Sequence, residues 1–343
     1  MNNQFSTKIS TGLQSLIKLK NDWIALEKLA NSHPFDSFFW CLNQANLHAE
    51  QDRTVIVVCV YDLNRCVAIL PLVQQNISRK LKIPCLQHLC SAFTDYQNFI
   101  FAPSVDSRIL FQLCISKLAE SEYANLPLVF NYPSPELRQC CLSMKRYFRQ
   151  HIAFNHWCHS HYKADAAPLS SKVLREAKRR RKKLAQHANC EILINTAYDE
   201  KLIDWILDQN AKRFGPNQLT ATTNRTSVKR LLRSYQSSLH LSVVTIDGLP
   251  AAAHLGFLRG STLQYYLLAN DDNFRQFSAG IILLNEIIAV KSDPSNIDFL
   301  RGDEEYKKDW SNTVNIENGL ICLPSKVNII KAWLIKIYAK RNQ

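Results

Sequence analysis

The sequence predicts an α/β protein of two similar domains, each a mixed, mostly antiparallel sheet flanked by helices. Length is the first observation, because 343 residues suit two domains of ordinary size. Composition is the second: 46% of the residues are hydrophobic, so each half can bury a core. The third is a pattern of helix, strand, turn and strand that occurs in both halves of the chain.

The repeated pattern is centred on two hairpins. Residues 57–70 and 243–255 each consist of two apolar stretches joined by a polar turn, which is typical of a β-hairpin. A helical stretch precedes each hairpin, at 37–49 and 226–238, and a further strand and helix follow. We therefore expect duplication of one structural unit; chance similarity between common hairpins is the alternative.

The boundary between the domains is expected near residues 162–168, where a polar and alanine-containing segment interrupts the periodic pattern. The expected domains are residues 1–163 and residues 164–343. Both are long enough to bury a core of their own.

The charge of the chain indicates its class of partner, and its cysteines indicate its cellular compartment. The chain has 42 basic and 29 acidic residues, a formal charge of +13, which favours anionic partners; an ordinary basic surface is the alternative. The 11 cysteines are odd in number and lack paired spacing, as in a reducing compartment. The chain opens with polar residues and has no apolar run of the ~20 residues that span a bilayer. We therefore expect a cytoplasmic protein.

A strongly basic helix is expected from about residue 171 to residue 188. Six consecutive cations, at 178–183, cover every side of such a helix. At least one of Arg180 and Arg181 must then lie against the protein body, beside a carboxylate or a bound anion. A solvated face with one ion pair, a clamp on an anionic ligand and a nucleic-acid contact are the three alternatives.

A strand, loop and helix follow the second hairpin. Residues 262–269 are expected to form a buried strand, and a polar turn leads to Arg275 and then to the small residues Ser278, Ala279 and Gly280. An apolar helix, 281–290, begins there. The start of a helix offers unpaired N–H groups and a positive dipole end, which suits a phosphate, although an ordinary helix cap explains the same residues.

The next strand ends in an unusual polar segment. After Asp298 and Phe299, Gly302 permits a sharp turn, and the carboxylates Asp303, Glu304 and Glu305 follow. Directly after them the chain places the residues Tyr306, Lys307 and Trp310. Strand ends are where α/β sheets place their chemistry.

These two segments together resemble the coenzyme A half of the GNAT acyltransferase superfamily. More narrowly, they are similar to the branch first associated with cellulose and exopolysaccharide biosynthesis, which is related to the Fem-type peptidoglycan aminoacyltransferases. The branch's downstream run is matched by Asp298, Phe299, Gly302, Tyr306, Lys307 and Trp310. Further pieces occur in the family's order over most of the chain: His33-Pro34-Phe35 ahead of Trp40, Asp95-Tyr96, and Arg179-Arg180-Arg181. The loop before the helix departs from the superfamily, because Gly280 is its only glycine.

The resemblance implies an acyltransferase of two tandem GNAT-like domains. The first would form the acceptor side without a cofactor, and the second would bind acyl-CoA, with an acetyl or longer acyl group, as co-substrate. The resemblance places the pyrophosphate at Arg275, Ser278, Ala279 and Gly280. The acceptor would be an amine, an amino sugar or glycan precursor of surface-polysaccharide biosynthesis.

Acyl transfer to an amine requires a base and an acid. Deprotonating an alkyl ammonium of pKa ~10 at neutral pH costs about 4 kcal/mol, for which a carboxylate among Asp303, Glu304 and Glu305 is the predicted base. Tyr306 is the predicted acid for the leaving thiolate; an aromatic plug is the alternative. His254 is a further candidate, because its small neighbours, at 252 and 256, leave room for a ligand; a satisfied sheet histidine is the alternative.

Several residues are predicted to contact the acceptor or other charged groups. Asp95 and Tyr96 are candidates for the acceptor groove, with turn chemistry as the alternative. Lys307, Arg180 and Arg181 are candidates for neutralising substrate charge. Histidines and a cysteine between residues 151 and 161 lack the spacing of a closed four-ligand site, so we expect no metal.

The C-terminal segment is expected to form a helix, and two alternative functions fit the sequence. Residues 326–341 form an apolar face surrounded by cations, expected as a closing helix, with peripheral contact at the inner face of a membrane as the alternative. Aminoacyl transfer from charged tRNA, as in the Fem-type relatives, is a second function. A non-catalytic binding protein on the same fold is a third. The oligomeric state is not predicted.

Overall fold

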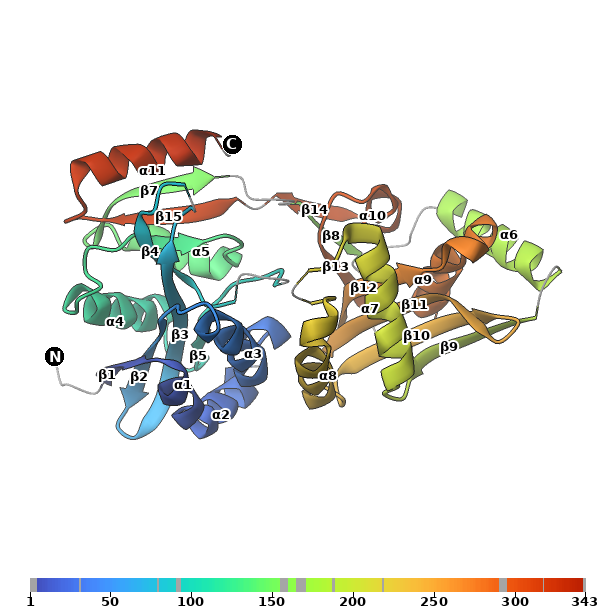
Figure 1. The fold of residues 1–343 in the computed structure, drawn as a ribbon, viewed down its shortest axis with the longest axis horizontal. Coiled ribbons are helices and arrows are strands. Elements are labelled where there is room, and N and C mark those ends of the chain that lie inside the picture. The colour runs from blue at the N-terminus through green and yellow to red at the C-terminus, as the bar shows by residue number, and fades with distance from the viewer. Residues whose placement is uncertain are drawn as a thin grey trace. The chain divides into compact units, whose positions relative to one another are not determined.

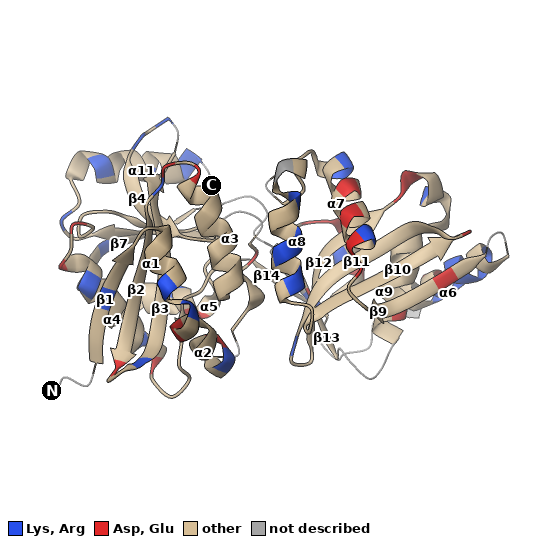
Figure 2. Cartoon of the chain, turned by 60° about the horizontal axis from the view of Figure 1, so that its bottom comes forward, with Lys and Arg blue, Asp and Glu red and all other residues tan. Residues whose placement is uncertain are grey.

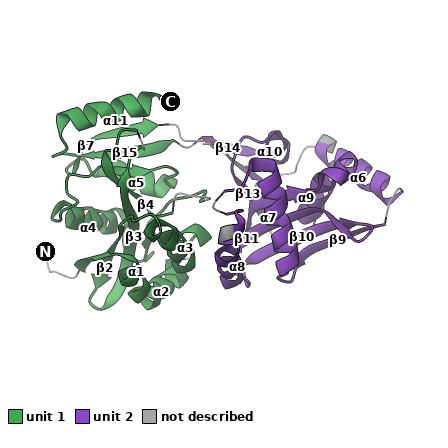
Figure 3. Ribbon diagram, viewed as in Figure 1, with its two compact units in different colours: residues 1–159, 317–343 green, residues 160–316 purple. Residues whose placement is uncertain are grey.

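The computed structural model describes residues 5–30, 32–78, 80–90, 94–154, 160–164, 171–186, 189–217, 219–289, 295–316 and 318–341. The chain forms two compact units (Figure 3). Unit 1 contains residues 1–159 and 317–343, and unit 2 contains residues 160–316. Each unit is built on its own sheet, so the expected α/β class is confirmed (Figure 1).

Unit 1 has an eight-stranded sheet in the order β1-β2-β3-β4-β6-β15-β7, with β5 paired to β3. Its strands are β1 Phe5–Thr11, β2 Val55–Asp62, β3 Arg65–Asn76, β4 Pro84–His88, β5 Ile100–Phe101, β6 Leu128–Phe130, β7 Phe148–Phe154 and β15 Gly319–Pro324. Its helices are α1 Leu13–Lys18, α2 Lys20–Ala30, η1 Pro34–Asp36, α3 Phe38–Ala49, α4 Ser107–Ala119, α5 Pro135–Ser143 and α11 Ile329–Arg341. Every pairing is antiparallel except that of β4 with β6.

Unit 2 has a seven-stranded sheet in the order β14-β8-β13-β12-β11-β10-β9. Its strands are β8 Ser160–Ala164, β9 Cys190–Thr196, β10 Leu239–Ile246, β11 Leu249–Arg259, β12 Thr262–Asn270, β13 Asn296–Arg301 and β14 Thr313–Ile316. Its helices are α6 Ser171–Ala185, α7 Glu200–Phe214, η2 Thr222–Asn224, α8 Arg225–Ser234, η3 Asp272–Phe277, α9 Ala279–Ala289 and α10 Glu305–Trp310. Here the parallel pair is β12 with β13.

The expected duplication is confirmed at the level of element order. The hairpin β2-β3 follows α3, and the hairpin β10-β11 follows α8. After each hairpin come a third antiparallel strand, a helix and a strand parallel to the third: β4, α4 and β6 in unit 1, and β12, α9 and β13 in unit 2.

The two units exchange one strand each, which corrects the expected domain boundary. β8 follows β7 in the chain but pairs with β13 and β14 in unit 2, whereas β15 follows β14 but pairs with β6 and β7 in unit 1. Residues 317–343 therefore lie in unit 1, not with residues 164–316 as expected. The physical reason is that all six residues of β15 are buried, so this strand needs a neighbour on both sides.

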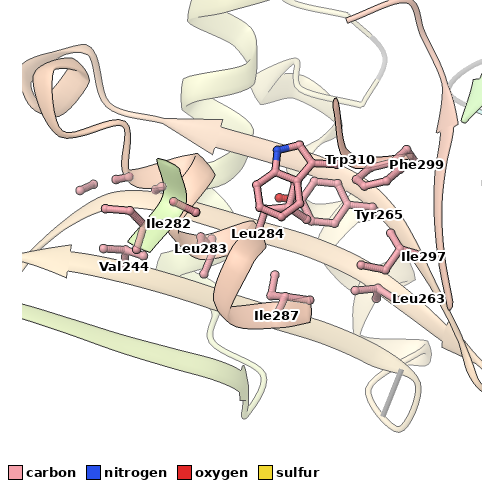
Figure 4. Packing of buried hydrophobic residues seen from close by; sticks show 14 of the residues in the cluster. Val244, Leu263, Tyr265, Ile282, Leu283, Leu284, Ile287, Ile297, Phe299 and Trp310 are labelled. Carbon is pink, nitrogen blue, oxygen red and sulfur yellow. The ribbon is translucent and has the colours of Figure 1, made fainter. Parts of the chain in front are cut away.

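The core of unit 2 lies between its sheet and α9. The apolar residues Ile282, Leu283, Leu284 and Ile287 of α9 pack in one cluster with Val244, Leu263, Tyr265, Ile297, Phe299 and Trp310 (Figure 4). Burying a side chain of this size contributes about 1.5–3 kcal/mol. This packing fixes the start of α9 relative to β12, which is where the candidate site lies.

Candidate active site

The parallel strands β12 and β13 separate after only three residue pairs. They pair from Thr262 with Asn296 to Gln264 with Asp298, and β12 then continues to Asn270 along β11 alone. The edge of residues 265–270 that faces away from β11 has no strand partner among the described residues. Crevices beyond the carboxyl ends of strands are where open α/β sheets bind ligands.

A local irregularity in β13 turns this strand. The pairing of β13 with β8 shifts register between Asp298 and Arg301. Within the shift Leu300 has a positive φ of 58°, and its N–H donates to Asp298 Oδ1 at 2.9 Å. A non-glycine residue in this conformation costs about 1–2 kcal/mol. Such bulges redirect strands next to functional sites.

A cavity of about 540 Å³ opens at the end of β12. It is lined by the ends of α7 and β12, the turn that follows, the start of α9, and α10. The lining residues are Gln209, Lys212, Arg213, Ala251, Leu268, Ala269, Asn270, Asp271, Asp272, Phe274, Arg275, Ser278, Ala279, Gly280, Ile281, Leu284 and Tyr306. Five of them were predicted as site residues from the sequence: Arg275, Ser278, Ala279, Gly280 and Tyr306. The structure therefore brings the predicted phosphate loop and the predicted acid to one cavity.

The start of α9 leaves backbone N–H groups open to this cavity. Ser278 has a left-handed backbone, and its carbonyl oxygen accepts from Ile281 N at 3.0 Å and from Ile282 N at 3.3 Å. The amides of Ala279 and Gly280 have no acceptor in the part of the chain that the structure describes. A Cβ at Gly280 would lie 2.4 Å from Asn270 Oδ1, so a larger residue would force that side chain to move.

The charges around the cavity favour an anion. Lys212 and Arg213, from the last turn of α7, and Arg275 line it with exposed side chains. Two carboxylates also line it, and one of them, Asp271, accepts from Asn273 N at 2.9 Å as the cap of η3. Three cations and the positive end of α9 thus face two carboxylates, which suits a ligand that carries several negative charges.

Tyr306 is a largely buried tyrosine that lines the cavity. It lies in the first turn of α10, and its ring packs edge-on against Phe299, with 6.2 Å between ring centroids. Burial raises the pKa of the Tyr306 hydroxyl well above its ordinary value, Glu304 raises it further, and Arg213 opposes both. The hydroxyl therefore stays protonated at neutral pH and is able to donate.

Gly302 and Lys307 hold the turn between β13 and α10. Gly302 has a φ of 126°, and a Cβ there would lie 2.8 Å from Lys307 Nζ. Lys307 Nζ donates to Arg301 O at 2.5 Å and forms an ion pair with Glu304 at 2.9 Å; the residue is only 3% exposed. Lys307 was predicted to contact substrate, but the structure places it inside this turn.

The predicted carboxylates lie outside the cavity. Asp303 and Glu305 are exposed, and Glu304 is engaged by Lys307. None of the three lines the cavity, whose carboxylates are instead Asp271 and Asp272. The sequence analysis missed this pair because it treated residues 270–273 only as a turn.

His254 is a core residue rather than a cavity residue. It is fully buried, and its ring stacks on Tyr265 with centroids 3.8 Å apart. A Cβ at position 256 would lie 2.7 Å from His254 Cε1, so the room beside Gly256 is filled by the imidazole itself, not by a ligand as expected. Neither ring nitrogen has a partner among the described residues. Burial, with a smaller effect of His240, lowers the pKa of His254 well below its ordinary value.

The basic helix α6 uses its arginines as ion pairs. Arg180 Nε lies 2.8 Å from Glu176 Oε1, and its Nη1 donates to Ser278 Oγ, at the rim of the cavity. Arg181 Nη1 lies 2.9 Å from Glu286 Oε1. The expectation that an arginine lies beside a carboxylate is confirmed, but neither arginine lines the cavity. Figure 2 shows further basic residues along α6.

The predicted acceptor residues Asp95 and Tyr96 belong to unit 1, whereas the cavity is built from unit 2. Asp95 is buried at 9% exposure, and the Tyr96 ring lies edge-on to His33 with centroids 5.1 Å apart. Beside them Trp40 Nε1 donates to Thr94 Oγ1 at 3.0 Å. The sequence motifs that surround Trp40, Asp95 and His33 are thus brought together in one cluster.

The described residues contain neither a group of metal ligands nor a membrane-spanning helix. No three His, Cys, Asp or Glu side chains among them are grouped as a metal would require, and His156, Cys158 and His159 lie outside the described residues. None of the described helices has the length and apolar character needed to cross a bilayer.

Lys212 and Arg213 are the functional candidates that the sequence analysis missed. They lie far from the phosphate loop in the sequence. Cations are also common in the last turn of a helix, because they interact favourably with the helix dipole, so they do not indicate a binding site. Only the packing of α7 beside β12 brings them to the cavity.

Comparison with known proteins identifies the fold. Residues 171–308 match the family model described as an acetyltransferase (GNAT) domain, and this segment contains all the residues that line the cavity. No curated protein matches the chain.

Three solved structures have the same fold over nearly their whole length. A structure of FemX aligns with a TM-score of 0.60 at 11% identity, covering 91% of this chain and 98% of FemX. The C-terminal domain of a putative lysylphosphatidylglycerol synthetase from Agrobacterium fabrum gives 0.57 at 10% identity, covering 96% and 97%. A conserved protein of unknown function from Bacteroides thetaiotaomicron gives 0.56 at 13%, covering 90% and 97%. The chain thus shares the fold of these three structures, and residues 171–308 resemble a GNAT domain.

Proposed function

We propose that this protein is an acyl-CoA-dependent N-acyltransferase whose second unit binds the thioester. One observation carries the proposal: the start of α9 with its open amides, Arg275 and Tyr306 all line a single cavity. A phosphate site and a proton donor are the two protein groups that acyl transfer from coenzyme A requires. The GNAT domain match spans this cavity and supports the same co-substrate.

The cavity fits a thioester that bears a diphosphate. The amides of Ala279 and Gly280, with Arg275, present donors and positive charge to the phosphate oxygens. Residues 267–270 lie beyond the last pair of β12 with β13, and their backbone groups suit an extended chain that carries amides, as coenzyme A does.

The reaction transfers one acyl group to the amine and one proton to the sulfur. The neutral amine nitrogen attacks the thioester carbonyl carbon, the C–S bond breaks, and the sulfur receives the proton of Tyr306. As the amide forms, the nitrogen loses a proton, which returns through water to the Tyr306 oxygen. The amine must lose a proton, at a cost of about 4 kcal/mol for an ammonium of pKa ~10 at neutral pH. Because residues 303–305 do not line the cavity, we place the first proton acceptor in water within it.

The acceptor class rests on the sequence resemblance alone. We propose an amine of an amino sugar or glycan precursor used in a surface polysaccharide. A panel of amino sugars and other primary amines, assayed for thiol release from acetyl-CoA, tests this class separately from binding of the thioester.

Calorimetry with acetyl-CoA tests the proposal itself. Wild-type protein should bind, and Arg275→Ala should bind about 10-fold to 100-fold more weakly, because a hydrogen bond to a charged group contributes about 1.5–3 kcal/mol. Arg65→Ala, at an exposed hairpin turn of unit 1, is the matched control and should bind as wild type does. Absence of binding by the wild type overturns the proposal.

Transfer from aminoacyl-tRNA is the second candidate, favoured by the exposed cations Lys178 and Lys182 of α6 and by the fold shared with FemX. Incubation with charged tRNA, without acyl-CoA, separates the two. Replacing both lysines by glutamine should abolish tRNA-dependent transfer if it occurs, and should leave thioester turnover unchanged. A protein that turns over neither donor fits the third possibility, a binding protein on this fold.

A further inference from the structure

The last helix of the chain is apolar on two opposite sides. The inner side of α11, with Ala332, Ile335 and Ala339, is buried in the cluster that contains Ile321 and Leu323. On the outer side, Ile329, Ile330 and Trp333 are exposed by 77%, 68% and 59%. A helix that is apolar all round is normally covered all round, so the outer side requires a partner.

Three exposed residues and the half-buried Ile337 form one continuous stripe. At about 100° per residue, the positions Ile329, Trp333, Ile337 and Ile330 fall within an arc of about 100°. The buried positions Ala332, Ile335 and Ala339 lie on the opposite arc. We call the four residues of the first arc the outer stripe.

Cations surround the outer stripe without any carboxylate. Lys331 and Lys336 fall on its two sides, and Lys340 and Arg341 lie at its C-terminal end. Lys326 lies just before the helix, and residues 325–341 contain no Asp or Glu. All five cations are exposed, and none forms an ion pair within the part of the chain that the structure describes.

We propose that α11 docks on a membrane surface that carries anionic lipids. The outer stripe would enter the boundary between headgroups and acyl chains, where Trp is favoured, while the lysines bind lipid phosphates. Charge complementarity selects this occupant, because the stripe of a second copy would bring two sets of cations together, which is unfavourable. The proposal does not depend on the enzymatic function.

Vesicle flotation tests the proposal with the full chain. Wild-type protein should float with vesicles of phosphatidylcholine and phosphatidylglycerol, and much less with phosphatidylcholine alone. Added salt should weaken the binding, because screening reduces attraction to the charged surface.

The first variant removes the apolar contact. It carries Ile329→Gln, Ile330→Gln and Trp333→Gln, and its control replaces exposed apolar residues of other elements by Leu63→Gln, Leu249→Gln and Val314→Gln. The α11 variant should lose at least about tenfold in vesicle binding, since burying each such side chain contributes about 1.5–3 kcal/mol in full. The control should bind as wild type does. Thermal unfolding followed by circular dichroism checks that both variants fold.

The second variant removes charge. It carries Lys331→Gln, Lys336→Gln and Lys340→Gln, and its control carries Lys178→Gln, Lys182→Gln and Lys201→Gln. At about 1 kcal/mol for each lysine near an anionic surface, the α11 variant should bind about 100-fold more weakly. An equal loss in the control shows that net charge alone drives binding and overturns the proposal.

Two further results would also overturn it. One is a wild-type protein that fails to float with anionic vesicles. The other is a dimer in analytical ultracentrifugation that the three glutamine substitutions of the outer stripe dissociate, which would assign the stripe to a second copy.

Discussion

Units 1 and 2 share one plan, but the starts of their central helices are capped differently. α4 and α9 occupy the same place in the element order, between a third strand and a strand parallel to it. The start of α4 is closed by Asp106, whose Oδ1 accepts from Arg108 N at 2.8 Å. At α9 the amides of Ala279 and Gly280 have no such acceptor among the described residues, although the starts of both helices line a cavity, of about 530 Å³ at α4 and about 540 Å³ at α9. In unit 1 the chain itself places an anion at the helix start.

The gap between the parallel strands differs in the same way. Beyond β4 and β6, Gln97 bridges the separating segments: its Nε2 donates to Cys90 O at 2.8 Å, and its Oε1 accepts from Tyr132 N at 3.1 Å. Beyond β12 and β13, residues 268–270 line the cavity instead. The two units therefore differ in how far the chain fills its own strand gap.

The largest change in affinity is expected when α9 of unit 2 receives an acidic residue at its start, as α4 of unit 1 has. Ser278→Asp puts a carboxylate at the start of α9, and like charges brought together cost several kcal/mol. Affinity for acetyl-CoA, measured by calorimetry, should fall by about 100-fold or more. Ser278→Asn is the matched control, since it has the same size without the charge and tolerates the left-handed backbone. Equal affinities of the two variants would contradict the comparison.

The next effect concerns Tyr306, the proposed proton donor of unit 2. Tyr306→Phe should lower kcat about 100-fold, within the usual contribution of a general acid, and change KM for acetyl-CoA less than about threefold. Tyr123→Phe in unit 1 should change neither constant. Because its pKa is raised above the ordinary value of 10, Tyr306 stays protonated there, so wild-type kcat should not decline as pH rises to 10. A decline that Tyr306→Phe removes would show that the pKa is not raised.

Buried histidines give a smaller contrast in stability. His88 in unit 1 has partners on both ring nitrogens: in the neutral ring Nε2 donates to Asn98 O at 2.7 Å, and Nδ1 accepts from Cys90 N at 3.2 Å. His254 in unit 2 has no partner among the described residues. His88→Phe should lower the free energy of unfolding by about 1–3 kcal/mol, because it leaves buried polar groups unpaired. His254→Phe should leave it unchanged or raise it. Urea unfolding measures both, and an equal loss would refute the contrast.

The same histidines make stability depend on pH. Burial lowers the pKa of His88 to about 4 in the folded state, while the unfolded value is the ordinary 6.5. Between these values the unfolded chain binds more protons, so the free energy of unfolding should fall as pH falls, by up to about 1.4 kcal/mol per pH unit for each such histidine. His254→Phe should reduce this slope in urea unfolding measured from pH 7 to pH 5; an unchanged slope would mean that His254 is not held neutral.

The smallest change is expected when the cap of α4 in unit 1 is removed. Asp106→Ala removes the cap of α4 and should lower the free energy of unfolding by about 1 kcal/mol, without changing affinity for acetyl-CoA. Glu120→Ala, at the other end of the same helix, should cause no loss, because a carboxylate is unfavourable near a helix C-terminus. New affinity for an anion in Asp106→Ala would sharpen the comparison further.

Local patterns predicted most of the fold but not its long-range pairings. Hairpin turns and the apolar helix at 281–290 are encoded by neighbouring residues, so they were predicted correctly. The exchange of β8 and β15 was not, because a buried strand such as 319–324 carries no local mark of its partners. Similarly, Arg275 and Gly280 share one loop with a recognisable pattern, whereas Lys212 reaches the cavity only through tertiary packing. The surroundings of His254 were misjudged because small neighbours predict space but not what fills it.

The exchange of β8 and β15 has a consequence for how the protein is made. During synthesis the sheet of unit 1 remains incomplete until β15, residues 319–324, leaves the ribosome. Its other strands have emerged long before. Until then the edges of β6 and β7 have no neighbour at that position and are open to wrong pairing. Residues 1–159 are therefore not an independent module: a gene cut after residue 159 would deprive the sheet of unit 1 of β15, one of its interior strands.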